Sequence, residues 1–208
     1  MHTSQPPRAP ALSHRAHVVS AALVVAVLLM SCHGPVGVLR GGPAVGPMQQ
    51  GEGWGTYCSP KHGQTDFVLG VESLDDTGDH HLVLDSATVA GPSNLTESGA
   101  YVTLVTPGSG EDLFGVVPGI PPQYFAKGQA SQWARRQPVR GAVVPARASG
   151  DLLNLLVVVH APDPHSKASV NHLVVHYHSG RQQYVYTGNV TYQLDPGDDC
   201  RTPRRFRD

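Results

Sequence analysis

The longest regular alternation of apolar and polar positions in the chain runs over residues 170–194. Apolar residues occupy the odd positions from Leu173 to Tyr177, and most of the even positions from Tyr184 to Leu194. A period of two residues is typical of a half-buried β-strand. Gly180, in the short polar segment between the two arms, can supply the positive φ that a tight turn needs. We therefore predict a β-hairpin over residues 170–194.

Shorter apolar segments, separated by glycine and proline, predict further strands at 67–71, 82–89, 101–105, 113–117 and 139–144. Residues 152–159 are almost continuously apolar, which predicts a central strand buried on both faces. Only residues 123–136 have a weakly helical pattern, and Gly128 limits it to a turn or two. Seven or eight short strands without a long helix predict an all-β fold, specifically an antiparallel immunoglobulin-like β-sandwich.

Composition agrees with a turn-rich β protein, because the 208 residues include 23 glycines and 18 prolines. After removal of an N-terminal targeting segment, the length allows one domain of roughly 140 residues. The formal net charge of -1 provides no positive field that would attract nucleic acid. We therefore expect no nucleic-acid partner.

The N-terminal region has the pattern of an export signal. Residues 1–17 are polar, with two arginines and no acidic residue, and Val18–Met30 is an uncharged apolar run. The sequence Leu-Met-Ser-Cys ending at Cys32 resembles a bacterial lipobox, which would make Cys32 a lipidation site. Alternatively, an apolar segment extending to residue 39 could span the membrane as an uncleaved anchor. Residues 1–39 are thus a signal peptide or a transmembrane anchor, with cleavage and release as a third possibility.

The rest of the chain divides around two cysteines. Residues 40–56 are rich in glycine and proline and predict a flexible tether. Cys58 and Cys200 stand near the two ends of the predicted sandwich domain, residues 57–200, and would form a disulfide in an oxidising compartment. Residues 201–208 form a short basic tail.

Three histidines with the same parity, His172, His176 and His178, predict one imidazole-bearing face of a strand. Two imidazoles two residues apart on a strand can bind a transition metal, whereas an ordinary solvated face would carry the same pattern. The chain contains no Cys-x-x-Cys, His-Glu-x-x-His or phosphate-binding glycine motif. We therefore expect neither an enzyme nor a bound cofactor.

The predicted signal, the tether, the segment LVVHYHSGRQQYVYT and the terminal Cys200 together resemble small exported envelope proteins of actinobacteria, whose function is uncharacterised. This resemblance implies a cell-membrane location with the domain on the extracytoplasmic side. The function that we expect is a membrane-tethered, non-catalytic binding or structural module, with an envelope protein or wall polymer as its partner. The alternative is a metal-binding envelope lipoprotein that uses the three histidines, and an enzyme without a local motif is a third class.

Overall fold

The structure is a computed structural model that describes residues 46–50, 54–78, 80–122, 128–197 and 200. The expected signal or anchor, Cys32 and the basic tail at 201–208 lie outside the described residues. Among the residues that are described, no helix has the length and apolar character needed to span a membrane.

The described residues confirm the all-β class, since 54% of them lie in strands and 6% in helices. The strands form three sheets, and pairing is antiparallel except between β14 and β2. The helices among the described residues are α2 (Gln129–Ala134) and the 3-10 turn η1 (Arg147–Ser149).

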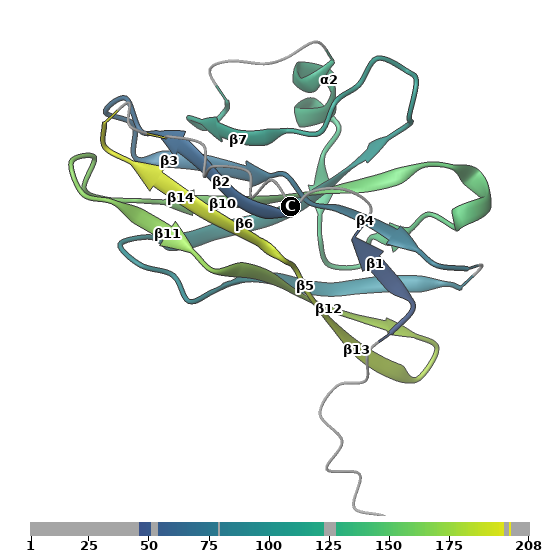
Figure 1. Cartoon of the computed structure of the whole chain (residues 1–208). Coiled ribbons are helices and arrows are strands. Elements are labelled where there is room, and N and C mark those ends of the chain that lie inside the picture. Colours follow the sequence, from purple (N-terminus) through teal and green to yellow (C-terminus); the bar gives the residue numbers. More distant parts are fainter. Residues whose placement is uncertain (1–45, 51–53, 79, 123–127, 198–199, 201–208) are drawn as a thin grey trace, which may run out of the picture. The chain divides into compact units, whose positions relative to one another are not determined.

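The largest sheet is built around β10 (Leu152–His160), as the apolar run predicts (Figure 1). One side of β10 pairs with β3 and β4, and the other side pairs with β6 along its whole length. The other members are β1 (Met48–Gln50), β3 (Asp66–Gly70), β4 (Ser73–Asp76), β6 (Thr96–Val105), β7 (Gly115–Pro118) and β8 (Gln137–Pro138).

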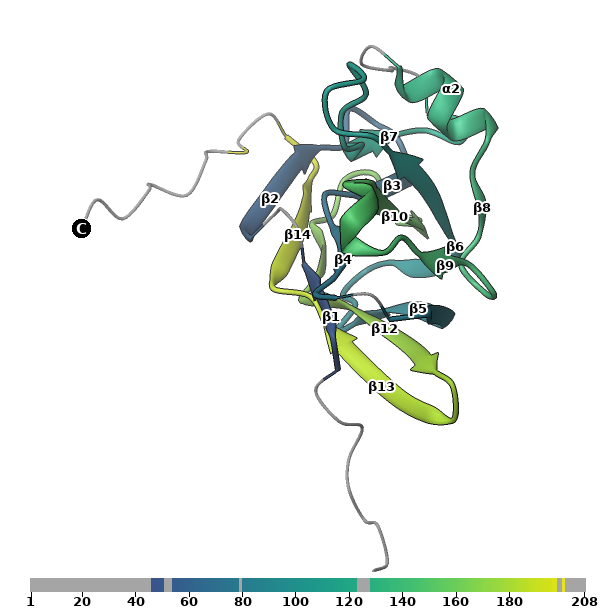
Figure 2. The ribbon, with the colours of Figure 1, turned by 90° about the vertical axis from the view of Figure 1, so that its right-hand side faces the viewer.

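Two smaller sheets complete the described fold (Figures 1 and 2). The four-stranded sheet has the order β13 (Gln182–Thr187), β12 (His172–Ser179), β5 (Leu82–Ala90) and β9 (Val143–Val144). The three-stranded sheet has the order β11 (Ala168–Val170), β14 (Val190–Asp195) and β2 (Gly55–Pro60).

The core lies on both faces of β10. Leu153, Leu155 and alternate residues beyond them join a main cluster with buried side chains of both smaller sheets. Leu156 and Val158 point the other way and join a second cluster that contains Trp133 of α2. Burial on both faces explains why β10 lacks the polar alternation of a surface strand.

The predicted hairpin forms, but its second arm ends earlier than expected. Gly180 has a φ of 58° and opens a two-residue turn between β12 and β13. β13 ends at Thr187, and the chain then passes through Gly188 into β14, which belongs to the three-stranded sheet. The even-position pattern continues through this change of sheet, because β14 also buries alternate residues.

Two strands begin inside residues 40–56, the segment that the sequence predicts to be a tether before the domain at 57–200. β1 pairs with β4, and Met48 is buried in the main cluster with its N–H donating to the Tyr177 hydroxyl at 3.2 Å. β2 begins at Gly55. The strand expected at 139–144 is also shorter, since a turn with Gly141 at a φ of 82° precedes β9.

Candidate binding surface

The outer side of the three-stranded sheet is polar. Val190, Tyr192 and Leu194 of β14 are buried, and the intervening residues face outward. Gln193 pairs with Ser169 of β11 on one side and with Cys58 of β2 on the other. We use the term polar face for the outward residues of this sheet together with the adjoining turn: Cys58, Ser93, Asn94, Lys167, Ser169, Thr191, Gln193 and Asp195.

One end of the polar face is hollowed into an open depression of about 310 Å³. Ser93 and Asn94, in the turn between β5 and β6, form one wall, and a backbone bridge between Ser93 and Ser169 fixes their position. Asn94 has a φ of 55°, in the left-handed region that asparagine tolerates better than most residues. The remaining lining residues are Lys167, Ala168, Ser169, Gln193, Leu194 and Asp195.

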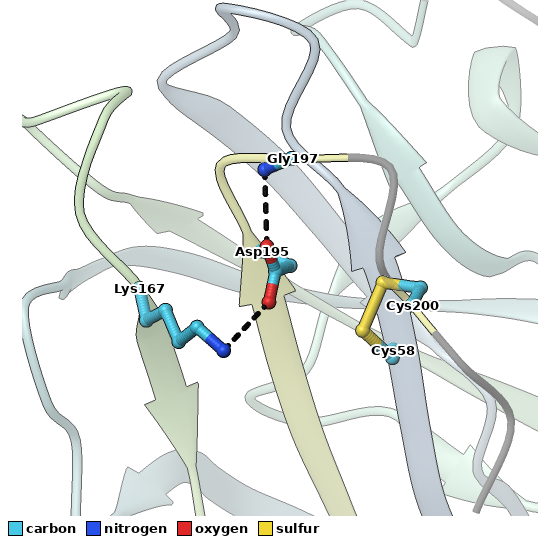
Figure 3. Close-up of a disulfide and its surroundings, with 5 residues drawn as sticks. All are labelled: Cys58, Lys167, Asp195, Gly197 and Cys200. Carbon is cyan, nitrogen blue, oxygen red and sulfur yellow. Dashed lines mark hydrogen bonds and ion pairs between the residues drawn. A yellow bond between two sulfur atoms is a disulfide. The ribbon is translucent and has the colours of Figure 1, made fainter.

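Hydrogen bonds and one ion pair hold the walls of the depression in place, and Figure 3 shows the two interactions of Asp195. Lys167 Nζ lies 3.0 Å from Asp195 Oδ2, and the backbone N–H of Gly197 donates to Asp195 Oδ1 at 3.0 Å. The hydrogen bond from the Gly197 N–H holds the pKa of Asp195 below its ordinary value, and the Lys167 ammonium acts in the same direction to a smaller extent. Asn94 Nδ2 donates to the Lys167 carbonyl at 2.9 Å. The Lys167 side chain itself remains 80% exposed, so its ammonium is open to a ligand.

The predicted disulfide between Cys58 and Cys200 is confirmed, and it joins Cys58 of the polar face to the segment after β14 (Figure 3). It links β2 to the segment after β14 across a sequence separation of 142 residues. A loop of that length should stabilise the fold by about 4–5 kcal/mol in the chain-entropy model. The bond therefore fixes the parallel β2–β14 pair that carries one side of the polar face.

A buried lysine, Lys61, lies at the C-terminal end of β14. The backbone N–H of Lys61 donates to the Asp195 carbonyl at 2.7 Å, and Lys61 Nζ donates to the Asp163 carbonyl at 2.8 Å. The Lys61 side chain has no solvent exposure, and burial lowers its pKa. Sequence reasoning missed this residue, because a lysine in a turn is ordinarily exposed.

The three predicted histidines lie on β12 with their side chains on its outer face. His176 is exposed, and His178 Nδ1 lies 2.9 Å from Asp85 Oδ1 on the neighbouring strand β5. Within the described ranges, no three His, Cys, Asp or Glu side chains are grouped so that they could hold a metal ion. The three histidines do not form such a group, and metal binding through them has no geometric support.

A second polar cluster, which the sequence did not indicate, is buried between the sheets. Glu72, between β3 and β4, has no solvent exposure, and its carboxylate accepts hydrogen bonds from Tyr186 at 3.2 Å and Tyr192 at 3.3 Å. Burial raises the pKa of Glu72 to about 7 from an ordinary 4.5, although both hydroxyls act in the opposite direction. Burial and the nearby carboxylate also raise the pKa of each tyrosine.

The backbone at Gly188, where the chain leaves the four-stranded sheet, lies close to the Glu72 carboxylate. A Cβ placed on Gly188 would overlap the Glu72 carboxylate, so only glycine fits there without a shift. Asn154 Nδ2 donates to the carbonyls of Gly70 and Glu72 at 2.7 and 3.0 Å and fixes the backbone around the glutamate. Because Glu72 is enclosed, we assign it a structural role, and the polar face is the candidate site for a ligand.

Comparison with known proteins does not supply a family: no protein-family model and no curated protein matches this chain.

Proposed function

We propose that this protein is a membrane-tethered, exported, non-catalytic module that binds a hydroxyl-rich polymer of the cell envelope through its polar face. The disulfide supports export, because such bonds persist in oxidising compartments. The N-terminal sequence supports tethering, because a polar segment followed by an apolar run precedes the folded residues. The resemblance to actinobacterial envelope proteins supports an extracytoplasmic location.

The observation that carries the proposal is the chemistry of the depression. Amides of Asn94 and Gln193, the hydroxyl of Ser93 and the Lys167–Asp195 ion pair line one open hollow. Each sugar hydroxyl both donates and accepts hydrogen bonds, and amide and hydroxyl side chains can do the same. An open depression also suits a long polymer better than a closed pocket would.

The strands that carry these groups also favour binding. Gln193 lies on the central strand of its sheet, and the disulfide ties β2 to the chain beyond β14. A rigid strand presents polar groups in fixed positions, which lowers the entropic cost of binding. We also infer that the largest sheet and the two smaller sheets are the layers of an immunoglobulin-like sandwich, because the main core cluster combines side chains of all three.

Cosedimentation with two insoluble preparations from an actinobacterium, purified peptidoglycan sacculi and wall polysaccharide, tests this proposal. We expect the protein to sediment with at least one of them, and Gln193→Ala to weaken binding by about tenfold, the loss expected from one or two hydrogen bonds. Gln137→Ala is the matched control, because Gln137 is an exposed glutamine on β8. Absence of sedimentation with either preparation, or equal binding by Gln193→Ala and Gln137→Ala, would overturn the proposal.

A further inference from the structure

Among the described strands, the outer strand of the β12–β13 hairpin is an unprotected sheet edge. β13 pairs with β12 on one side and ends the four-stranded sheet on the other (Figure 2). It is six residues long, QQYVYT, and contains neither a proline nor a charged residue. Natural proteins usually protect exposed edges with proline, charge, bulges or short strands, because a bare edge pairs with other chains.

The other terminal strands of the described sheets have such protection. β6 and β5, which β8 and β9 cover over two residues each, contain the charged residues Glu97 and Asp85. β1, β8, β9 and β11 contain three residues or fewer. β2 ends at Pro60 and β7 ends at Pro118, and proline cannot donate to a sheet ladder. β13 thus differs from them in being both long and unprotected, which points to a partner strand.

The register of the hairpin identifies the backbone groups that face this partner. Ser179 and Gln182 flank the two-residue turn and form the hydrogen-bonded pair that closes it. Pairs alternate along an antiparallel ladder, so the backbone N–H and C=O groups of Gln183, Val185 and Thr187 point away from β12. These three residues are arranged symmetrically about Val185.

We propose that this edge is the contact between two copies of the chain, with β13 pairing antiparallel to β13 of the second copy about a two-fold axis at Val185. Gln183 then pairs with Thr187 of the other copy, and Val185 pairs with its own equivalent. Every outward backbone donor meets an acceptor, as an isologous two-fold contact requires. The two four-stranded sheets become one continuous sheet.

Side chains along the edge are compatible with a second copy. Val185 and Thr187 meet uncharged residues in this register, so no like charges oppose each other. On the inner face, Tyr184 would lie opposite Tyr186 of the other copy. Tyr184 is already stacked on Tyr177, with ring centroids 5.2 Å apart, so pairing would extend an aromatic row.

The position of the N-terminal end of the fold also favours a second copy. A Cβ on Gly46 would overlap the Tyr177 hydroxyl and the Tyr184 ring, so the chain enters the fold against the inner face of this hairpin. A two-fold axis perpendicular to the joined sheet keeps the inner faces of both copies on the same side. Both chains would therefore enter from one side, as the tethering in the proposed function requires for two copies in one membrane.

Site-specific crosslinking of the full-length chain in membranes tests the contact. In the proposed register the Cα atoms at position 185 are about 5.5 Å apart, within the range of a disulfide. We expect Val185→Cys to give a disulfide-linked dimer on oxidation. Val143→Cys, on β9 at the opposite edge of the same sheet, is the matched control. It should give no disulfide-linked dimer, and neither should the wild-type chain.

Charge substitutions test the same contact without a new cysteine. Val185→Lys and Val185→Glu should each be monomeric by light scattering of the detergent-solubilised full chain, and an equal mixture should recover the dimer. Val143→Lys should leave the dimer intact. A monomeric wild-type chain, equal crosslinking at positions 185 and 143, or capture of a different protein by Val185→Cys would overturn the inference. Polymer binding by monomeric Val185→Lys would show that the proposed function stands independently.

Discussion

Replacing Glu72 by glutamine removes an ionisable group from the interior while preserving its size. The wild-type carboxylate has two tyrosine hydroxyls as partners, and the described residues place no cation against it. Ionisation therefore leaves a buried negative charge compensated only by hydrogen bonds, which is costly. Glutamine remains neutral at every pH and keeps one carbonyl acceptor for Tyr186 or Tyr192.

The expected size of the effect follows from linkage between protonation and folding. The pKa of Glu72 is raised to about 7 in the folded protein from an ordinary 4.5. The folded state thus binds the proton of Glu72 more tightly than the unfolded state does. The contribution of this proton to the unfolding free energy is complete below pH 4.5 and is lost as the pH rises through 7. At about 1.4 kcal/mol for each pH unit, the interval corresponds to about 3 kcal/mol of unfolding free energy.

Urea unfolding at pH 4.5 to 8.5, followed by fluorescence of the buried Trp133, measures this difference. The wild-type protein should lose stability relative to Glu72→Gln across the interval, so that the variant is the more stable protein at pH 8.5. Subtracting the two profiles removes the contribution of the histidines. Glu97→Gln, a glutamate that accepts a hydrogen bond from the Val89 N–H, is the control and should retain the wild-type slope. Parallel profiles for wild type and Glu72→Gln would refute the reasoning.

Two further perturbations test the contributions of the Cys58–Cys200 disulfide and of Gly188 to stability. Reducing the Cys58–Cys200 disulfide, or replacing both cysteines by serine, should lower the unfolding free energy by about 2–5 kcal/mol, measured as a lower urea midpoint. Equal midpoints for oxidised and reduced protein would contradict this expectation. Gly188→Ala should cost about 1–3 kcal/mol, because its Cβ overlaps the Glu72 carboxylate. The same substitution in a Glu72→Ala background should cost less, and additive losses in the double variant would exclude direct contact.

Local patterns in the sequence predict those elements whose residue types are set by their own secondary structure and burial. The apolar run at 152–159 predicts β10 because a strand covered on both faces has little room for polar side chains. Gly180 predicts the hairpin turn because its positive φ is a local requirement. The Cys58–Cys200 pair follows from the number and placement of the cysteines, together with the expectation that the chain is exported.

Features that depend on distant residues escape the same reasoning. Glu72 is buried by Tyr186 and Tyr192, which are more than a hundred residues away along the chain, and a glutamate in isolation predicts exposure. The parallel pairing of β2 with β14 brings together two segments near opposite ends of the fold. The depression at Gln193 combines the turn between β5 and β6 with β11 and β14, so it could not be predicted from periodicity alone.

The disulfide also determines how the fold would respond to mechanical tension. Cys58 lies in β2, near the N-terminal end of the fold, and Cys200 follows its last strand. A pull between the N-terminal and C-terminal ends of the chain would pass through this covalent bond, leaving the strands between the cysteines outside the loaded path. At about 3.4 Å per residue, the separation of 142 residues represents about 480 Å of chain that stretching could not release while the bond is intact. Under load the domain would therefore behave as a short, nearly inextensible link between its two ends.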